Sequence, residues 1–174
     1  MQLDRFIKHL LTTRWQVQRA FPRRTLDAIE AAIRAGEAQH GGEIRFAVEG
    51  ALDGRPLFEG QSARGRAIDV FSQLRVWDTE NNNGLLIYVL LADRAVEIVA
   101  DRGIDTKVGS DEWSAVCHEM ETAFRQANHE AGVVAGVQAV TRHLAAHFPA
   151  AGQPGNELPD APVVLQGRGS WRPN

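Results

Sequence analysis

The sequence concentrates oxygen-bearing side chains in a short turn, residues 78–84 (DTENNNG), directly before the continuously apolar residues 85–91. Asp78, Glu80 and Asn82 offer carboxylate and amide oxygens at alternate positions. Hard divalent cations such as Ca²⁺ and Mg²⁺ prefer oxygen ligands of this kind. The turn is not an EF-hand loop, because its glycine comes one residue late and the twelfth position is a valine instead of a glutamate. A cation bound here therefore needs further ligands from elsewhere in the chain.

Two more acidic residues follow the next apolar segment. Residues 85–91 and 96–100 read as two strands joined by a short turn, which predicts an antiparallel hairpin. Because the first strand begins and the second ends at the same edge of the sheet, Asp101 and Asp105 are expected beside the 78–84 turn. Neighbouring carboxylates repel each other unless a cation or protons intervene. The predicted metal ligands are Asp78, Glu80, Asn82, Asp101 and Asp105. The alternative is an ordinary turn, which Asn-Asn-Gly also favours.

Other chemical motifs are weaker. The chain has neither a P-loop nor a G-x-G-x-x-G sequence opening a helix, so no nucleotide motif is found. Residues 60–66 combine glycines, a helix start at Ser62 and two arginines, which indicates either a phosphate site or a capped helix with an exposed basic face. Cys117 is the only cysteine and lies on an apolar helical stripe, where we expect a buried, unreactive thiol.

Charge is distributed unevenly along the 174 residues, whose net charge is −3. Residues 1–34 carry seven Lys/Arg and three Asp/Glu, a net charge of +4. Residues 78–121 carry three Lys/Arg and ten Asp/Glu, a net charge of −7. The acidic segment argues against nucleic acid as the ligand. No secretory signal is visible, and no stretch approaches the roughly 20 apolar residues that span a bilayer. We expect a cytoplasmic protein.

The N-terminal segment, residues 1–21, is predicted to be basic and amphipathic. Its apolar residues recur at helical spacing, with basic residues off that stripe: Leu3, Phe6, Ile7, Leu10 and Leu11. One interpretation is a helix that meets the inner face of the membrane or a membrane-associated partner. The other is a terminal helix whose apolar stripe packs on its own core.

The remaining pattern predicts an α/β fold. A helix should run from Pro22 to about His40, and residues 43–49 alternate as a strand with one buried face. A loop over residues 50–60, a helix capped by Ser62 and the hairpin follow, and then one helix from Ser110 and another from Asn128 to about His147. These elements predict a three-layer α/β/α sandwich with a small mixed sheet, a strand-helix-strand unit plus the hairpin, covered by helices on both faces. The domain should span residues 22–148, and the Pro/Gly-rich residues 149–174 are expected to be disordered.

Three blocks of the sequence resemble the TPM domain family: residues 67–78 (AIDVFSQLRVWD), 82–89 (NNGLLIYV) and 94–104 (RAVEIVADRGI). The similarity extends over roughly residues 40 to 148 and is strongest to short bacterial members without a membrane anchor. It implies a sheet sandwiched by helices, divalent-cation binding in some members and acid phosphatase activity in the plant branch. The family's acidic positions correspond to Asp78 or Glu80 and to Asp105. Asp101 replaces a family glycine, and Asn128 stands where an acid is common.

Three functional hypotheses follow. The first is a cation-binding interaction module that acts near the membrane surface, with Ca²⁺ or Mg²⁺ at the acidic edge. The second is a metal-dependent phosphatase for phosphomonoesters, in which cation-bound water is the nucleophile. The third is a structural interaction domain without an ion.

Overall fold

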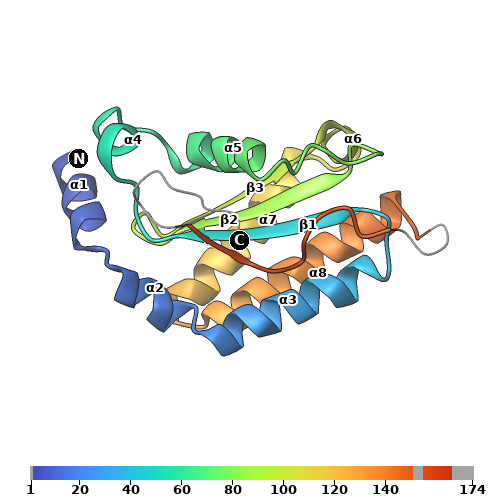
Figure 1. The fold of residues 1–174 in the computed structure, drawn as a ribbon, viewed down its shortest axis with the longest axis horizontal. Coiled ribbons are helices and arrows are strands. Elements are labelled where there is room, and N and C mark those ends of the chain that lie inside the picture. The colour runs from blue at the N-terminus through green and yellow to red at the C-terminus, as the bar shows by residue number, and fades with distance from the viewer. Residues whose placement is uncertain (1, 151–154, 166–174) are drawn as a thin grey trace.

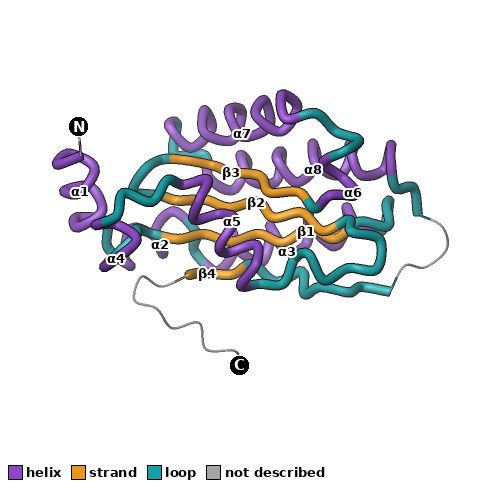
Figure 2. The backbone as a smooth tube through the Cα atoms, turned by 90° about the horizontal axis from the view of Figure 1, so that it is seen from above, coloured by secondary structure: helices purple, strands orange, loops and turns teal. Residues whose placement is uncertain are grey.

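The computed structural model of the chain describes residues 2–150 and 155–165. A mixed sheet of four strands forms its middle layer: β1 (Glu43–Glu49), β2 (Gly84–Leu90), β3 (Ala95–Ala100) and β4 (Val163–Leu165). The strand order is β3-β2-β1-β4, as seen in Figure 2. β1 runs parallel to β2 and β4, whereas β2 and β3 form the predicted antiparallel hairpin.

Helices cover both faces of this sheet (Figure 1). One face carries α2 (Arg14–Ala20), α3 (Arg23–Glu37), α7 (Ser110–Arg125) and α8 (His129–His147). The other carries α4 (Gly54–Phe58) and α5 (Ala63–Gln73). The N-terminal helix α1 (Gln2–Leu11) lies at one end of the sheet, and the short α6 (Arg102–Asp105) follows β3 at the other (Figure 1). The predicted three-layer α/β/α sandwich is confirmed.

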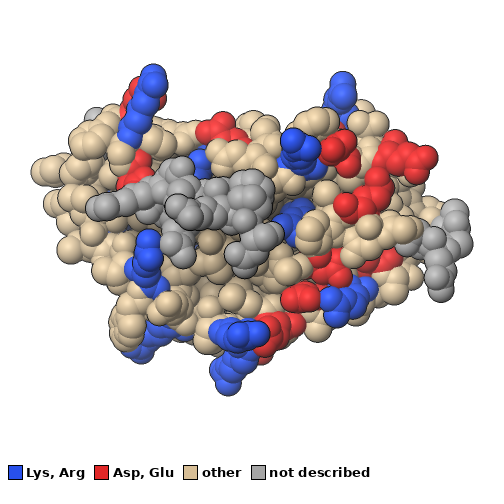
Figure 3. All heavy atoms as spheres, viewed as in Figure 1, with Lys and Arg blue, Asp and Glu red and all other residues tan. Residues whose placement is uncertain are grey.

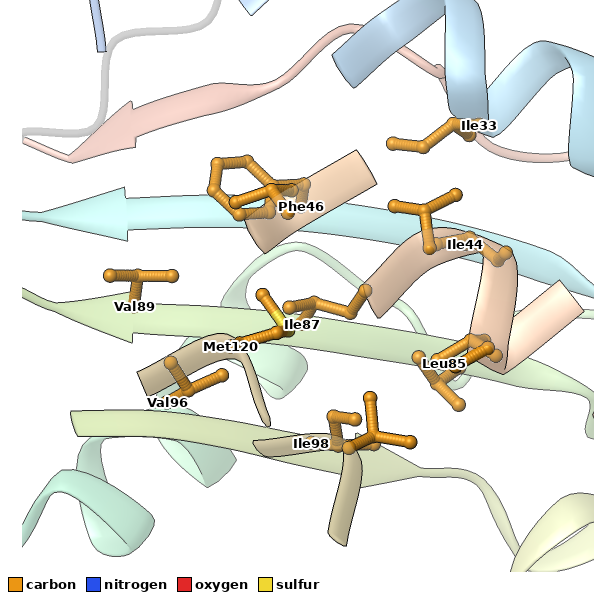
Figure 4. Close-up of a cluster of buried hydrophobic side chains, with 14 of the residues drawn as sticks. Ile33, Ile44, Phe46, Leu85, Ile87, Val89, Val96, Ile98 and Met120 are labelled. Atoms are coloured by element: carbon orange, nitrogen blue, oxygen red, sulfur yellow. The ribbon is translucent and has the colours of Figure 1, made fainter. Parts of the chain in front are cut away.

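The larger core lies between the sheet and α3, α7 and α8 (Figure 4). Phe46 from β1, Ile87 from β2 and Met120 from α7 are at most 1% exposed and belong to this core. Successive side chains of β2 point to opposite faces of the sheet. Ile87 therefore belongs to the larger core, whereas its neighbours Leu86 and Tyr88 pack in a second core on the α5 side. A strand that serves two cores must be apolar on both faces, which explains the unbroken apolar run of β2.

The prediction that β1 has one buried face is wrong. All seven of its residues are buried, including the charged Glu43, Arg45 and Glu49. Alternation of charged and apolar residues usually indicates a solvent-facing side. Here helix α5 and the C-terminal segment cover that side, and the charged groups find hydrogen-bond partners there.

The C-terminal segment also differs from expectation. Residues 155–165 are described, and Val163–Leu165 pairs in parallel with Ala47–Glu49 of β1 as the fourth strand. The prediction of disorder from residue 149 is therefore wrong for residues 155–165, while residues 151–154 and 166–174 lie outside the described part. A three-residue strand in a Pro/Gly-rich context carries too little periodicity to be recognised. The predicted loop over residues 50–60 contains the short helix α4.

Candidate functional site

The 78–84 turn and the start of α6 meet at one end of the sheet (Figure 1). The backbone N–H of Asp101 donates to the carbonyl oxygen of Gly84 at 2.9 Å, and the N–H of Gly103 donates to the carbonyl oxygen of Asn82 at 2.9 Å. The β2–β3 hairpin produces this meeting, because Gly84 begins β2 and Ala100 ends β3. Figure 3 shows acidic side chains gathered over the end of the molecule where α6 lies. We call this region the acidic end.

The five predicted ligands occupy different environments at the acidic end. Asp101 is buried, with 7% of its surface exposed, and its Oδ1 accepts a hydrogen bond from the N–H of Arg102 at 2.7 Å. Its second carboxylate oxygen, Oδ2, is buried and has no hydrogen-bond partner among the described residues. The other four predicted ligands are exposed: Asp78, Glu80, Asn82 and Asp105. Asp101 is thus the member of the set with a buried oxygen left to bind a ligand.

Backbone carbonyls add to the oxygen atoms around α6. A Cβ atom on Gly103 would lie 2.5 Å from the carbonyl oxygen of Asn82 and 2.8 Å from that of Asn81, so both carbonyl oxygens lie close to this glycine. In the described part of the chain, no three or more His, Cys, Asp or Glu side chains are grouped closely enough to hold a metal ion. A cation at the acidic end would therefore use carbonyl and amide oxygens together with carboxylates, a mixture that suits Ca²⁺.

Asn83 organises the turn, although sequence reasoning did not single it out. Its side chain is 1% exposed and donates from Nδ2 to the carbonyl oxygen of Gly41. Its backbone N–H donates to Oγ1 of Thr79 at 3.1 Å, and its carbonyl oxygen accepts from the N–H of Glu43 at 3.1 Å. Its Oδ1 is buried without a partner among the described residues. An asparagine directly before a strand-initial glycine was the available signal, but it does not reveal burial.

Residues 60–66 form a capped helix start with engaged arginines. Oγ of Ser62 accepts from the N–H of Gly65 at 3.0 Å, as the predicted N-cap requires. Arg66 is bound to Glu49, and Arg64 donates to the carbonyl oxygen of Ile98. Arg64 is exposed, as the capped-helix interpretation expected, whereas Arg66 is turned toward Glu49 and its charge is neutralised there.

Cys117 matches the expectation of an unreactive thiol. Burial, together with the nearby negative charge of Glu97, raises the pKa of its thiol to about 12. The thiolate, which is the nucleophilic form, is therefore scarce at neutral pH.

A second group of acids lies between α3, β1 and the C-terminal segment, and its members were missed as site residues. Both carboxylate oxygens of Glu43 accept backbone N–H groups, from Glu157 and Leu158, at 3.1 Å each. Burial raises the pKa of Glu43 and lowers that of Arg45. Oε1 of Glu37 accepts from the N–H of Ile44 at 3.0 Å. The Glu43 contacts attach the C-terminal segment to the sheet, and the Glu37 contact joins α3 to β1.

Glu37 gives this group a pH dependence. Burial, and then the charges of Glu43 and Asp160, raise its pKa from 4.5 to about 8. The folded state thus favours protonated Glu37, so this contribution to stability is complete below about pH 4.5 and is lost as the pH rises through about 8. Glutamine stays neutral at every pH. We therefore expect the free energy of unfolding of Glu37→Gln to exceed that of wild type by about 1–3 kcal/mol between about pH 6 and pH 9, measured by urea unfolding at each pH.

Asp27→Asn is the matched control, since Asp27 is an exposed acid on the same helix. It should keep the pH profile of the wild-type chain. A Glu37→Gln profile parallel to wild type would contradict the assignment of the pH dependence to Glu37.

The N-terminal helix contacts the domain through polar groups. Arg5 binds Asp93 through Nε and Nη2, the latter at 2.7 Å, and Nε2 of His9 lies 2.9 Å from Oδ1 of Asp93. The N–H of Leu52 donates to Nδ1 of His9 at 2.9 Å, so the ring proton belongs on Nε2 and is donated to Asp93. Although burial acts in the opposite direction, the hydrogen bonds from Arg5 and His9 lower the pKa of Asp93.

This polar attachment leaves the apolar stripe of α1 facing outward. Leu3, Leu10 and Leu11 are 69%, 65% and 67% exposed. Ile7 is exposed as well, whereas Phe6 is half-buried and packs against the second core. The interpretation in which this stripe packs on the protein's own core therefore holds for Phe6 and not for the other four residues. No helix in the described ranges combines the length and the apolar character that crossing a bilayer requires.

The fold and the acidic end define a three-layer α/β/α domain in which two loops rich in oxygen-bearing side chains meet at one end of the sheet. The family model for the TPM domain matches residues 18–143, and the chain belongs to this family. The comparison with curated proteins finds no match.

Solved structures agree with this assignment. The NMR structure of the BA42 protein from the psychrophilic bacterium Bizionia argentinensis is similar with a TM-score of 0.71 and 32% identity, over 82% of this chain and 93% of that one. The N-terminal domain of a protein from P. gingivalis is similar with a TM-score of 0.59 and 21% identity, over 75% of this chain and 82% of that one. The N-terminal domain of cg2496 from Corynebacterium glutamicum is similar with a TM-score of 0.52 and 13% identity, over 86% of this chain and 83% of that one. The last two similarities concern the fold alone.

Proposed function

We propose that this TPM domain is a divalent-cation-binding interaction module that acts near a membrane surface. The observation that carries the proposal is the buried Oδ2 of Asp101, which has no partner in the described part of the chain. A buried carboxylate oxygen without a donor is costly, and a bound cation would remove that cost.

The residues at the acidic end supply enough oxygen atoms for such a cation. Asp101 offers its free carboxylate oxygen, and the carbonyl oxygens of Asn81 and Asn82 lie beside Gly103 of α6, the latter already accepting the N–H of Gly103. Asp78, Glu80 and Asp105 are exposed at the same end of the sheet. Ca²⁺ accommodates flexible sets of six to eight oxygen ligands, so this arrangement favours Ca²⁺ over the stricter octahedron of Mg²⁺. Bound cation would fix the turn against α6 and thereby rigidify a surface for a partner.

The exposed stripe of α1 supports the membrane part of the proposal. An apolar helix face beside basic residues is typical of proteins that meet a membrane or a membrane-associated partner. α1 contacts Asp93, just beyond the end of β2, whereas the acidic end precedes the start of that strand. The two features therefore act at opposite ends of the molecule.

Titration with CaCl₂ or MgCl₂ watched by amide NMR tests the cation site. We expect shifts confined to residues 78–84 and 101–105 below about 10 mM ion, with Asp101→Asn weakening the affinity about tenfold or more. Asparagine still caps a helix, so this variant changes the charge and leaves α6 intact. Asp27→Asn removes the same charge far from the site and should bind like wild type. Wild-type amide signals that do not shift at that ion concentration would contradict the proposal.

A further inference from the structure

Exposed large apolar side chains gather at the end of the molecule that carries α1. Of nine such side chains in the described part of the chain, seven lie at this end. Four belong to α1, namely Leu3, Ile7, Leu10 and Leu11. The other three are Trp15 on α2, Phe58 on α4 and Val164 on β4. We call this region the apolar end.

A cavity of about 410 Å³ lies within the apolar end, between α1, α2, α4 and the last residues of β4. Phe6, Val17 and Leu57 contribute apolar walls, and the rings of Phe6 and Phe58 are in tilted contact with centroids 5.4 Å apart. Leu10 and Phe58 line this cavity and are also exposed, so the cavity is continuous with the outer apolar surface.

Charge around the apolar end indicates which partner it meets. Lys8, Arg14 and Arg19 are exposed and form no ion pair within the described ranges. The guanidinium of Arg19 lies 5.3 Å from the centre of the Trp15 ring, an arrangement in which both side chains can reach an interface. Asp4 and Asp53 are the acids here that lack an ion pair in the described part, so free cations outnumber free anions.

The opposite end of the sheet carries the acidic turn and α6 (Figure 1), and acidic side chains gather there (Figure 3). In the field of an anionic surface, this separation of charge turns the apolar end toward the surface and the acidic end away from it. Orientation by charge and burial of apolar side chains therefore act in the same direction.

We propose that the apolar end docks directly on a bilayer that contains anionic phospholipids. α1 then lies in the plane of the headgroups with its leucines in the acyl boundary, and Lys8, Arg14 and Arg19 meet lipid phosphates. This inference rests on the membrane location proposed above and commits it to lipid contact instead of a protein partner.

Flotation of the full chain with vesicles tests the proposal. We compare phosphatidylcholine vesicles with vesicles in which part of the phosphatidylcholine is replaced by phosphatidylglycerol, both in EDTA so that no cation bridges protein and lipid. We expect binding to the anionic vesicles at least about tenfold stronger than to the neutral ones, decreasing with added salt.

Two isoleucines provide a matched pair of variants. Ile7 on α1 is 45% exposed and Ile68 on α5 is 47% exposed, so replacing either with serine removes the same exposed group without emptying the core. Ile7→Ser should weaken vesicle binding about tenfold, and Ile68→Ser should leave it unchanged. Lipid spin-labelled at the headgroup should broaden amide signals of α1 and α4 and spare residues 78–84.

The proposal is overturned by equal binding of both vesicle types or by equal behaviour of the two isoleucine variants. Self-association of the chain that Ile7→Ser abolishes, without vesicle binding, would instead assign the apolar end to a protein contact and likewise overturn it. Because the cation titration needs no lipid and the flotation contains no free divalent cation, failure of one leaves the other interpretable.

Discussion

Replacing Arg66 with methionine is expected to lower the free energy of unfolding by about 3–5 kcal/mol. Arg66 on α5 donates from Nε and Nη2 to the two carboxylate oxygens of Glu49, at 2.8 and 2.9 Å. Glu49 is 2% exposed, and the hydroxyl of Tyr88 donates to its Oε2 at 2.7 Å. Removing the guanidinium leaves a buried carboxylate with one neutral donor, which is the costly half of a broken buried ion pair.

Urea unfolding of Arg66→Met and of Arg55→Met measures this effect against a matched control. Arg55 pairs with Glu59 at 2.6 Å, but the two side chains are 85% and 59% exposed. The same substitution there should cost less than about 1 kcal/mol. Adding Glu49→Gln to Arg66→Met should recover part of the loss, because it removes the stranded charge. Equal losses in Arg66→Met and Arg55→Met would contradict a role for burial.

The Glu49 network also shows why sequence reasoning succeeded for the fold and failed for its charged interior. Burial and the charge of Glu49 raise the pKa of Tyr88, so the phenol stays protonated and serves as a donor. In the sequence, Glu49 appears only as a charged residue in an alternating strand. Its partners come from α5 and β2, and no local pattern encodes that three-dimensional meeting.

Elements whose signal is local were predictable. The apolar run of β2, the short turn to β3 and the cap at Ser62 each depend on a few neighbouring residues, and the structure contains all three. The pairing of β4 with β1 joins residues more than a hundred positions apart, and three residues carry no periodicity. The sequence left open whether the apolar stripe of α1 is buried, because an amphipathic pattern shows that a helix has an apolar face without showing what covers that face.

The same distinction applies to the candidate site. The meeting of residues 78–84 with residues 101–105 follows from the antiparallel hairpin, so sequence reasoning could place the two loops together. The burial of Asp101 and of Asn83 could not be read from residue types, since acids and asparagines in turns are usually exposed. The feature that most favours a ligand, the free Oδ2 of Asp101, depends on that burial.

The separation of the two ends limits what the protein can do. β2 has seven residues, so the acidic end and the attachment of α1 are roughly 20 Å apart along the strand. One small molecule cannot contact both. A cation at the acidic end would therefore affect membrane docking only through the surface it presents to a further partner, while the apolar end holds the domain in place.

Replacing Gly84 with alanine should have the second large effect, about 2–4 kcal/mol of destabilisation. Gly84 begins β2, and a Cβ atom there would lie 1.9 Å from the backbone carbonyl oxygen of Val76. Since backbone atoms cannot rotate away as a flexible side chain can, the chain from Val76 to the turn must move. That movement would strain the hydrogen bond from the backbone N–H of Asp101 to the carbonyl oxygen of Gly84. The contact between the turn and α6 depends on this hydrogen bond.

Gly41→Ala is the control for Gly84→Ala, because a Cβ atom at Gly41 meets no heavy atom within 4 Å. Its stability should stay within about 0.5 kcal/mol of wild type in urea unfolding, or rise slightly as the unfolded chain loses freedom. Gly84→Ala should also lose affinity in the calcium titration even where most of the protein remains folded, since the turn no longer lies against α6. A Gly84→Ala chain as stable as Gly41→Ala would show that the turn yields easily, and a site that depends on its fixed position would then have no structural basis.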